Sequence, residues 1–102
     1  MKNNLIDELE ENCDYVAGLL KTMAHPKRLM ILCHLTQGRR SVSELEELSG
    51  ISQSQVSQFL KRMQYENLVD FEKEGNFIYY SIKDKRVQDL ISKMHGIFCK
   101  RK

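Results

Sequence analysis

A run of polar side chains between residues 53 and 62 combines hydrogen-bonding groups with two cations and contains no carboxylate. Phosphates would repel a carboxylate, whereas glutamine pairs well with adenine, serine serves several bases, and lysine and arginine hold phosphates. The pattern is therefore typical of a surface that contacts DNA. We call this set the polar face: Gln53, Ser54, Gln55, Ser57, Gln58, Lys61 and Arg62.

The three cysteines, Cys13, Cys33 and Cys99, are a second source of chemistry. Structural disulfides are rare in a reducing cytosol, so paired cysteines there indicate metal binding or redox chemistry. Cys33 and Cys99 are 66 residues apart, and only the fold can bring them together. Cys33 alone, in the run LMILC, is typical of a small buried apolar residue. Cys13 falls off the main apolar stripe of its segment and is interpreted as a bystander or a secondary thiol.

The length of 102 residues is that of one domain, and we expect a single domain over 1–102. The longest uninterrupted apolar run, Leu29–Cys33, has five residues and is too short to cross a membrane. Acidic residues interrupt the N-terminal segment, which therefore lacks the apolar core of a signal peptide. These features predict a cytoplasmic protein with no membrane partner.

The net charge of +2 is distributed unevenly along the chain. Residues 1–14 carry a net charge of −4, and the other 88 residues carry +6. The basic surplus lies in the part that contains the polar face, as a nucleic-acid partner requires.

Apolar residues at helical spacing predict a series of helices that surround the polar face. Pro26 starts the second helix, and Gly50 ends the third. Ser43 and Glu46 are interpreted as the capping box of the third helix, and Ser52 as the cap of the fourth. The predicted helices cover 5–22, 26–35, 43–50, 52–65 and 84–99.

The period changes after residue 67, where β-branched and aromatic residues predict strands over 68–72 and 77–82. The segment Lys73–Asn76 between them is a hairpin signal. The order α-α-α-α-β-β-α predicts a mainly α fold with a small β-hairpin, a winged helix-turn-helix. The first and last helices carry apolar stripes with no other place to be buried, so we expect a homodimer through these two helices.

Three segments of the chain together resemble the ArsR family of bacterial winged-helix repressors. They are LLKTMAHPKRLMILCHL (19–35), SVSELEELSGISQSQVSQFLKRMQYENLVD (41–70) and GNFIYYSI (75–82). Within the family the chain is most similar to the thiol-based sulfur sensors of the BigR, SqrR and HlyU type. These carry the cysteine of RLMILC, here Cys33, and a second cysteine at the end of the last helix, here Cys99 of HGIFC.

The resemblance implies a homodimeric repressor that binds an inverted repeat in double-stranded DNA. The fourth helix would enter the major groove, with its glutamines and serines at the bases and with Lys61 and Arg62 at phosphates. At the hairpin wing, Lys73 and Asn76 are the candidate DNA contacts, and Glu74 makes the wing only weakly basic.

The metal sites of the family are incomplete in this chain. The stretch 41–45, which corresponds to the metal site of the third helix, has no cysteine. The zinc site of the last helix retains Asp84, but Arg86, Ile97 and Lys100 stand at the other positions. We therefore expect no metal and no cofactor. A metal-responsive repressor with a non-standard cysteine site, completed by His34 or His95, is the alternative.

In the sulfur sensors the equivalent cysteines meet within one subunit, beneath the last helix. The resemblance therefore implies that reactive sulfur species are the effector of this chain. One thiol would attack a persulfide and the second would resolve it, giving a disulfide or a bridge of several sulfurs. Linking Cys33 to Cys99 would change how the last helix packs on the second and would weaken DNA binding.

Other classes of function have less support. A thiol enzyme would need a nucleophile with its base, or a Cys-x-x-Cys motif in a βαβ unit, and the chain has neither, so we expect no enzyme. A winged helix used only for protein contacts is a further alternative. Some HlyU-like members oppose a silencing protein and activate genes, so the position of the operator decides between repression and activation.

Overall fold

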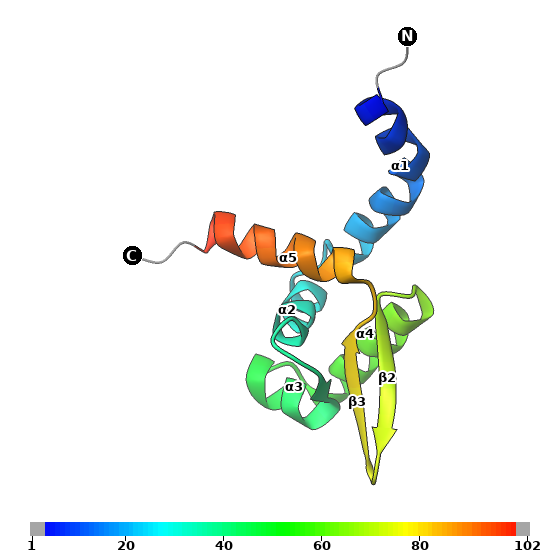
Figure 1. Cartoon of the computed structure of the whole chain (residues 1–102). Helices are drawn as coiled ribbons and strands as arrows, with labels where there is room; N and C mark the ends of the chain where they lie inside the picture. The colour runs from blue at the N-terminus through cyan, green and yellow to red at the C-terminus, as the bar shows by residue number, and fades with distance from the viewer. Residues whose placement is uncertain (1–3, 100–102) are drawn as a thin grey trace.

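The computed structural model describes residues 4–99. In Figure 1, the hairpin β2–β3 projects from a body made by α2, α3 and α4, whereas α1 and α5 extend away from that body in different directions. This is the winged helix-turn-helix that the sequence predicts, with one additional short strand. The elements are α1 (Asn4–Met23), α2 (Pro26–Leu35), β1 (Arg40–Ser41), α3 (Val42–Ser49), α4 (Gln53–Tyr65), β2 (Val69–Glu74), β3 (Phe77–Ile82) and α5 (Lys85–Phe98).

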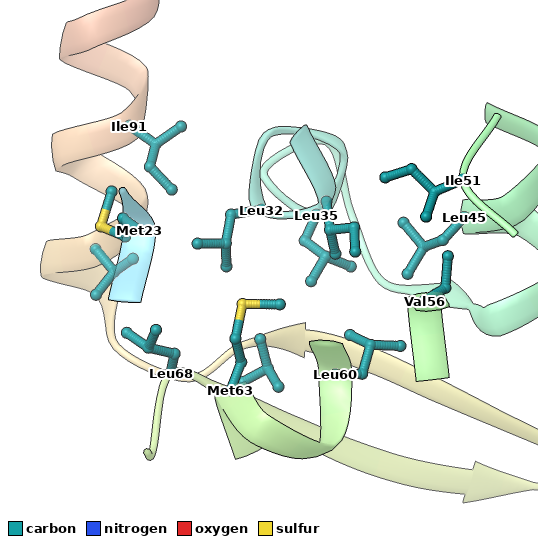
Figure 2. Close-up of a cluster of buried hydrophobic side chains, with 13 residues drawn as sticks. Met23, Leu32, Leu35, Leu45, Ile51, Val56, Leu60, Met63, Leu68 and Ile91 are labelled. Atoms are coloured by element: carbon teal, nitrogen blue, oxygen red, sulfur yellow. The ribbon is translucent and has the colours of Figure 1, made fainter. Parts of the chain in front are cut away.

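The hydrophobic core lies between α2, α3 and α4 and continues beneath α5. Leu32 and Leu35 of α2 face Leu60 and Met63 of α4 at the centre of the cluster (Figure 2). These four side chains are between 0% and 3% exposed. The apolar stripe of α4 is therefore buried, which leaves the opposite side of that helix free for its polar residues.

The sheet is antiparallel, with strand order β1-β3-β2. Strand β1 is not predicted from the sequence, because its two polar residues, Arg40 and Ser41, give no alternating pattern. They pair with Tyr80 and Tyr79 of β3. Gly75 takes a φ of 63° in the turn between β2 and β3, a conformation that glycine adopts without steric cost.

The predicted capping box of α3 was placed two residues too late. Ser41, not Ser43, is the N-cap: its Oγ accepts a hydrogen bond from the Glu44 N–H at 3.2 Å, and the Glu44 carboxylate accepts one from the Ser41 N–H at 2.9 Å. The motif Ser-x-x-Glu occurs twice in this stretch. Pairing of Ser41 with β3 holds it in the extended conformation that an N-cap needs, and this selects the first copy.

Both outer helices leave apolar side chains exposed. Leu5 and Leu9 of α1 are 76% and 60% exposed, and Phe98 of α5 is 80% exposed. By contrast, the first half of α5 is anchored to the core through Val87 and Ile91. Within residues 4–99, no helix has the length and apolar character that a membrane span requires.

Candidate functional site

The start of α4 is fixed by Ser52, whose Oγ accepts a hydrogen bond from the Gln55 N–H at 3.3 Å. This confirms the predicted cap. Val56, Leu60 and Met63 are fully buried, so the helix has one rotational setting on the core. That setting decides which polar residues point outward.

The residues of the polar face form a central stripe with two flanks. Ser54, Gln58 and Lys61 are exposed and follow one another at spacings of four and three, which places them on one line along the helix. Gln53 and the half-buried Ser57 flank this line on one side. The half-buried Gln55 and the exposed Arg62 lie on the other flank.

Tyr65 extends the central stripe by one more turn and is 85% exposed. It follows Lys61 by four residues, so its position on the polar side of α4 could have been read from the sequence. A phenolic hydroxyl is a further donor to phosphate oxygens.

Lys27 in the first turn of α2 also reaches the polar face. Its Nζ donates a hydrogen bond to Oε1 of Gln55 at 3.3 Å. The two residues are 28 positions apart, so no local pattern in the sequence pairs them. The exposed ammonium of Lys27 adds positive charge beside this flank of α4.

Arg62 is engaged within its own helix. Its Nε donates a hydrogen bond to the Glu66 carboxylate at 2.8 Å, and this bond raises the pKa of the Arg62 guanidinium. Glu66 also accepts a hydrogen bond from the Thr22 hydroxyl, which lowers the pKa of the Glu66 carboxyl. The guanidinium is thus oriented along α4, with part of its charge already balanced.

At the wing, Lys73 and Asn76 are exposed, as the candidate contacts must be. Because side chains alternate along a strand, the three carboxylates of β2 share one side of the hairpin, and Lys73 lies on the other. Arg39, just before β1, pairs with two of them, Glu72 and Glu74.

The two predicted sensor cysteines belong to parts of the chain that are distant in sequence, α2 and the end of α5, and these two helices pack against each other. Cys33 is half-buried in α2, and Cys99 is exposed directly after α5. Both are free thiols. Burial raises the pKa of the Cys33 thiol above its usual value, and the charge of the nearby Cys99 raises it further. Cys13 is also a free thiol and lies exposed on α1.

Asp84, which matches one zinc ligand of the family, is the N-cap of α5. It accepts hydrogen bonds from the Arg86 N–H at 2.9 Å and from the Tyr15 hydroxyl at 2.9 Å, and the Arg86 guanidinium pairs with the same carboxylate. These partners lower the pKa of the Asp84 carboxyl far below its usual range, with the Arg86 side chain as the main cause. Across residues 4–99, no group of three or more His, Cys, Asp or Glu side chains is arranged to hold a metal ion. Lys100 lies outside the described residues.

Comparison with known proteins identifies the family. Residues 25–70, which include α2, α3 and α4, match the model of the arsR family of bacterial regulatory proteins. The chain is also 40% identical to the HTH-type transcriptional regulator YgaV of Escherichia coli over 93 residues, which is 90% of this chain and 94% of YgaV. The chain belongs to the ArsR family. It is thus a transcriptional regulator of the winged-helix type, as the sequence resemblance implied.

Solved structures agree with this assignment. The ArsR-family chain superposes on the transcriptional repressor BigR from Xylella fastidiosa with a TM-score of 0.86 and 35% identity, covering 93% of this chain and 97% of BigR. For reduced HlyU from Vibrio cholerae the TM-score is 0.84 at 35% identity, with 91% and 98% covered. A homodimeric winged helix-turn-helix DNA-binding domain from Mycobacterium bovis, Mb0332, gives 0.76 at 30% identity, with 89% and 84% covered.

Proposed function

We propose that this ArsR-family regulator binds an inverted-repeat operator as a homodimer and releases it when reactive sulfur species link Cys33 to Cys99. The observation that carries the proposal is the packing of α5 against α2, because these two helices bring the thiols to the same side of the fold. Cys33 lies within α2 and Cys99 directly follows α5, and the charge of Cys99 raises the pKa of the Cys33 thiol. In this proposal the output is DNA binding by the polar face, and the input is the reaction of the thiol pair with the sulfur species.

The polar face has the composition and the exposure that base contacts require. Gln58 and Ser54 on the central stripe are the residues to reach base edges, and Lys61 holds a phosphate. Gln53, Gln55 and Ser57 line its flanks, and Arg62 lies where it can leave Glu66 for a phosphate. Lys73 and Asn76 extend the contact through the wing.

A homodimer gives the exposed apolar side chains of the outer helices a place to be buried. These residues are Leu5, Ile6, Leu9 and Leu20 on α1, and Ile97 and Phe98 on α5. The similarity to the homodimeric Mb0332 domain supports the same assembly here. A two-fold axis would set the two copies of α4 one helical turn of DNA apart, about 34 Å, and an inverted repeat matches that symmetry.

The chemistry begins at Cys99, because it is exposed whereas Cys33 is half-buried with a raised pKa. The Cys99 thiolate attacks the sulfane sulfur of a persulfide RSSH, the S–S bond breaks, and RSH leaves with the proton that Cys99 released. The Cys33 thiolate then attacks Sγ of the resulting Cys99 persulfide, and hydrogen sulfide leaves. Two thiols are oxidised to a disulfide, and one sulfane sulfur is reduced. When both cysteines carry a sulfane sulfur first, loss of hydrogen sulfide gives a trisulfide.

The link would act on DNA binding through α5. The first half of this helix is held by Val87 and Ile91 in the core, whereas its end, with Ile97 and Phe98, is exposed. A bond from Cys99 to α2 draws this end toward the body and reshapes the surface proposed for the dimer. A coupling of about 1–3 kcal/mol is enough to change operator occupancy substantially.

Mass spectrometry after treatment with an organic persulfide tests the input. We expect a Cys33–Cys99 cross-linked peptide, with the mass of a disulfide or of a bridge with added sulfur, and we expect it to be absent from Cys33→Ser. Cys13→Ser is the matched control, because it removes an exposed thiol and leaves the pair intact. No cross-link in the wild-type protein would refute the sulfur-sensing function.

DNA binding is tested separately with a duplex selected by the reduced protein from a random library. An inverted repeat should emerge, and the persulfide-treated protein should bind it more weakly. Zinc, cadmium and arsenite serve as the comparison. Tight, stoichiometric binding of one of these metals that releases the duplex would establish the metal-responsive alternative instead.

A further inference from the structure

The wing carries carboxylates that DNA phosphates would repel, whereas the polar face of α4 contains none. Glu72 and Glu74 lie on β2, and Glu74 directly precedes the turn at the tip. A strand rises about 3.3 Å per residue, so both carboxylates lie within about 10 Å of the tip, one screening length in ordinary salt. A wing that approaches phosphates with two bare carboxylates would be repelled.

Arg39 reduces this repulsion, because its positive charge offsets one of the two negative charges. Its guanidinium donates to Glu72 at 3.1 Å and also pairs with Glu74. It lies over the ring of Tyr79, with 4.3 Å from the guanidinium carbon to the ring centroid. One planar group therefore contacts two carboxylates and one aromatic face, an arrangement for which arginine is suited and lysine is not.

The position of Arg39 in the fold lets it connect strands of the sheet as well as offset charge. We call this connection the strap. It directly precedes β1, whose Ser41 pairs with Tyr79 of β3, and Tyr79 in turn pairs with Glu72 of β2. The guanidinium thus reaches across β3 from the β1 side to β2. Ser41 is also the N-cap of α3, so the strap joins the wing to the beginning of the helix-turn-helix.

We propose that Arg39 is a positioning residue that prepares the wing for DNA by offsetting one of the two negative charges of Glu72 and Glu74 and by tying the hairpin to β1. The inference rests on the proposed DNA binding and adds to it a residue that holds the wing ready. Lys73, on the opposite side of the hairpin from the carboxylates, then has its charge free for phosphate.

The experiment measures binding of the selected duplex to the full chain at several salt concentrations. R39Q should bind about tenfold more weakly than the wild type at low salt, and the gap should narrow as salt rises, because screening weakens the repulsion. R39Q/E72Q/E74Q should recover most of the lost affinity. E72Q/E74Q should bind more tightly than the wild type, because it removes the repulsion while Arg39 keeps its contact with the Tyr79 ring.

The matched control is K85Q, which also removes one cation from an exposed ion pair, that of Lys85 with Asp89 on α5. Its affinity for the duplex should match that of the wild type. R39Q at wild-type affinity, a triple variant as weak as R39Q, or E72Q/E74Q no tighter than the wild type would each overturn the proposal. If R39Q does not fold, the E72Q/E74Q result decides alone. Failure of the wild type to select any duplex would refute the proposed DNA binding itself.

Discussion

Helix α4 carries its whole polar face within 13 consecutive residues, whereas Cys33 and Cys99 come from α2 and from the end of α5. The face needs only a helix and one buried stripe to be presented. The thiol pair needs α5 to be seated on the body. The proposed output is therefore local in sequence and rigid, whereas the proposed input depends on tertiary packing that chemistry at one helix end can alter.

The largest effect is expected from a substitution that loosens α5, because the thiol pair depends on this helix whereas the polar face does not. Ile91→Ala removes a side chain that is 3% exposed in the core, and we expect it to lower the free energy of unfolding by about 2–5 kcal/mol. Urea unfolding measures this loss. Cross-linking of Cys33 to Cys99 should also slow, because the end of α5 is less firmly placed over α2.

Lys93→Ala on the same helix is the control, because Lys93 is exposed and its removal should change stability by less than about 0.5 kcal/mol. Equal losses in the two variants would mean that Ile91 does not anchor α5.

A second substitution should weaken DNA binding by α4 without changing how this helix packs on the core. Gln58→Ala should weaken binding of the selected duplex by about 1–3 kcal/mol and relax the sequence preference, because a glutamine amide that pairs with a base is lost. Binding titrations on matched and mutated duplexes measure both effects. Unfolding should be unchanged, since Gln58 is exposed.

Gln88→Ala on α5 is the matched control for that substitution, because Gln88 is also an exposed helical glutamine. If the two variants bind the duplex equally well, Gln58 makes no base contact and α4 reads DNA through other residues.

The sequence predicts the local features of α4 better than the contacts that depend on tertiary packing. The apolar stripe and the N-cap of α4 are formed by residues close together in the sequence, so the bounds of this helix and its buried side were predicted correctly. Lys27 beside Gln55 and Arg39 beside Glu72 were not, because each pair is brought together by tertiary packing from positions 28 and 33 apart. The cysteines were paired by family resemblance, since no spacing rule places residues 66 apart.

The pH dependence of Cys33 sharpens the assignment of roles within the thiol pair. Burial raises the pKa of this thiol, so its thiolate fraction at neutral pH is smaller than that of an ordinary cysteine with a pKa of about 8.5. In Cys13→Ser/Cys99→Ser, where Cys33 is the sole thiol, alkylation should be several-fold slower than for a free cysteine at neutral pH. Its midpoint should lie above that of a free cysteine.

Restoring Cys99 adds the second, electrostatic contribution, so the Cys33 midpoint in Cys13→Ser should be higher still when read by peptide mass spectrometry. A midpoint at or below that of a free cysteine would make Cys33 the attacking thiol and reverse the proposed order of steps.

The smallest expected effect tests the junction between wing and helix-turn-helix. Ser41→Ala should cost about 1 kcal/mol of unfolding free energy, because the Glu44 N–H loses its acceptor at the start of α3. Ser43→Ala, two residues later in the second copy of the Ser-x-x-Glu motif, should cost almost nothing, because Ser43 is exposed and is not the cap. Thermal unfolding of the two variants side by side measures the difference. The reverse order would place the helix start at Ser43, would uncouple it from the pairing of Ser41 with Tyr79, and would remove the route by which Arg39 joins the wing to α3.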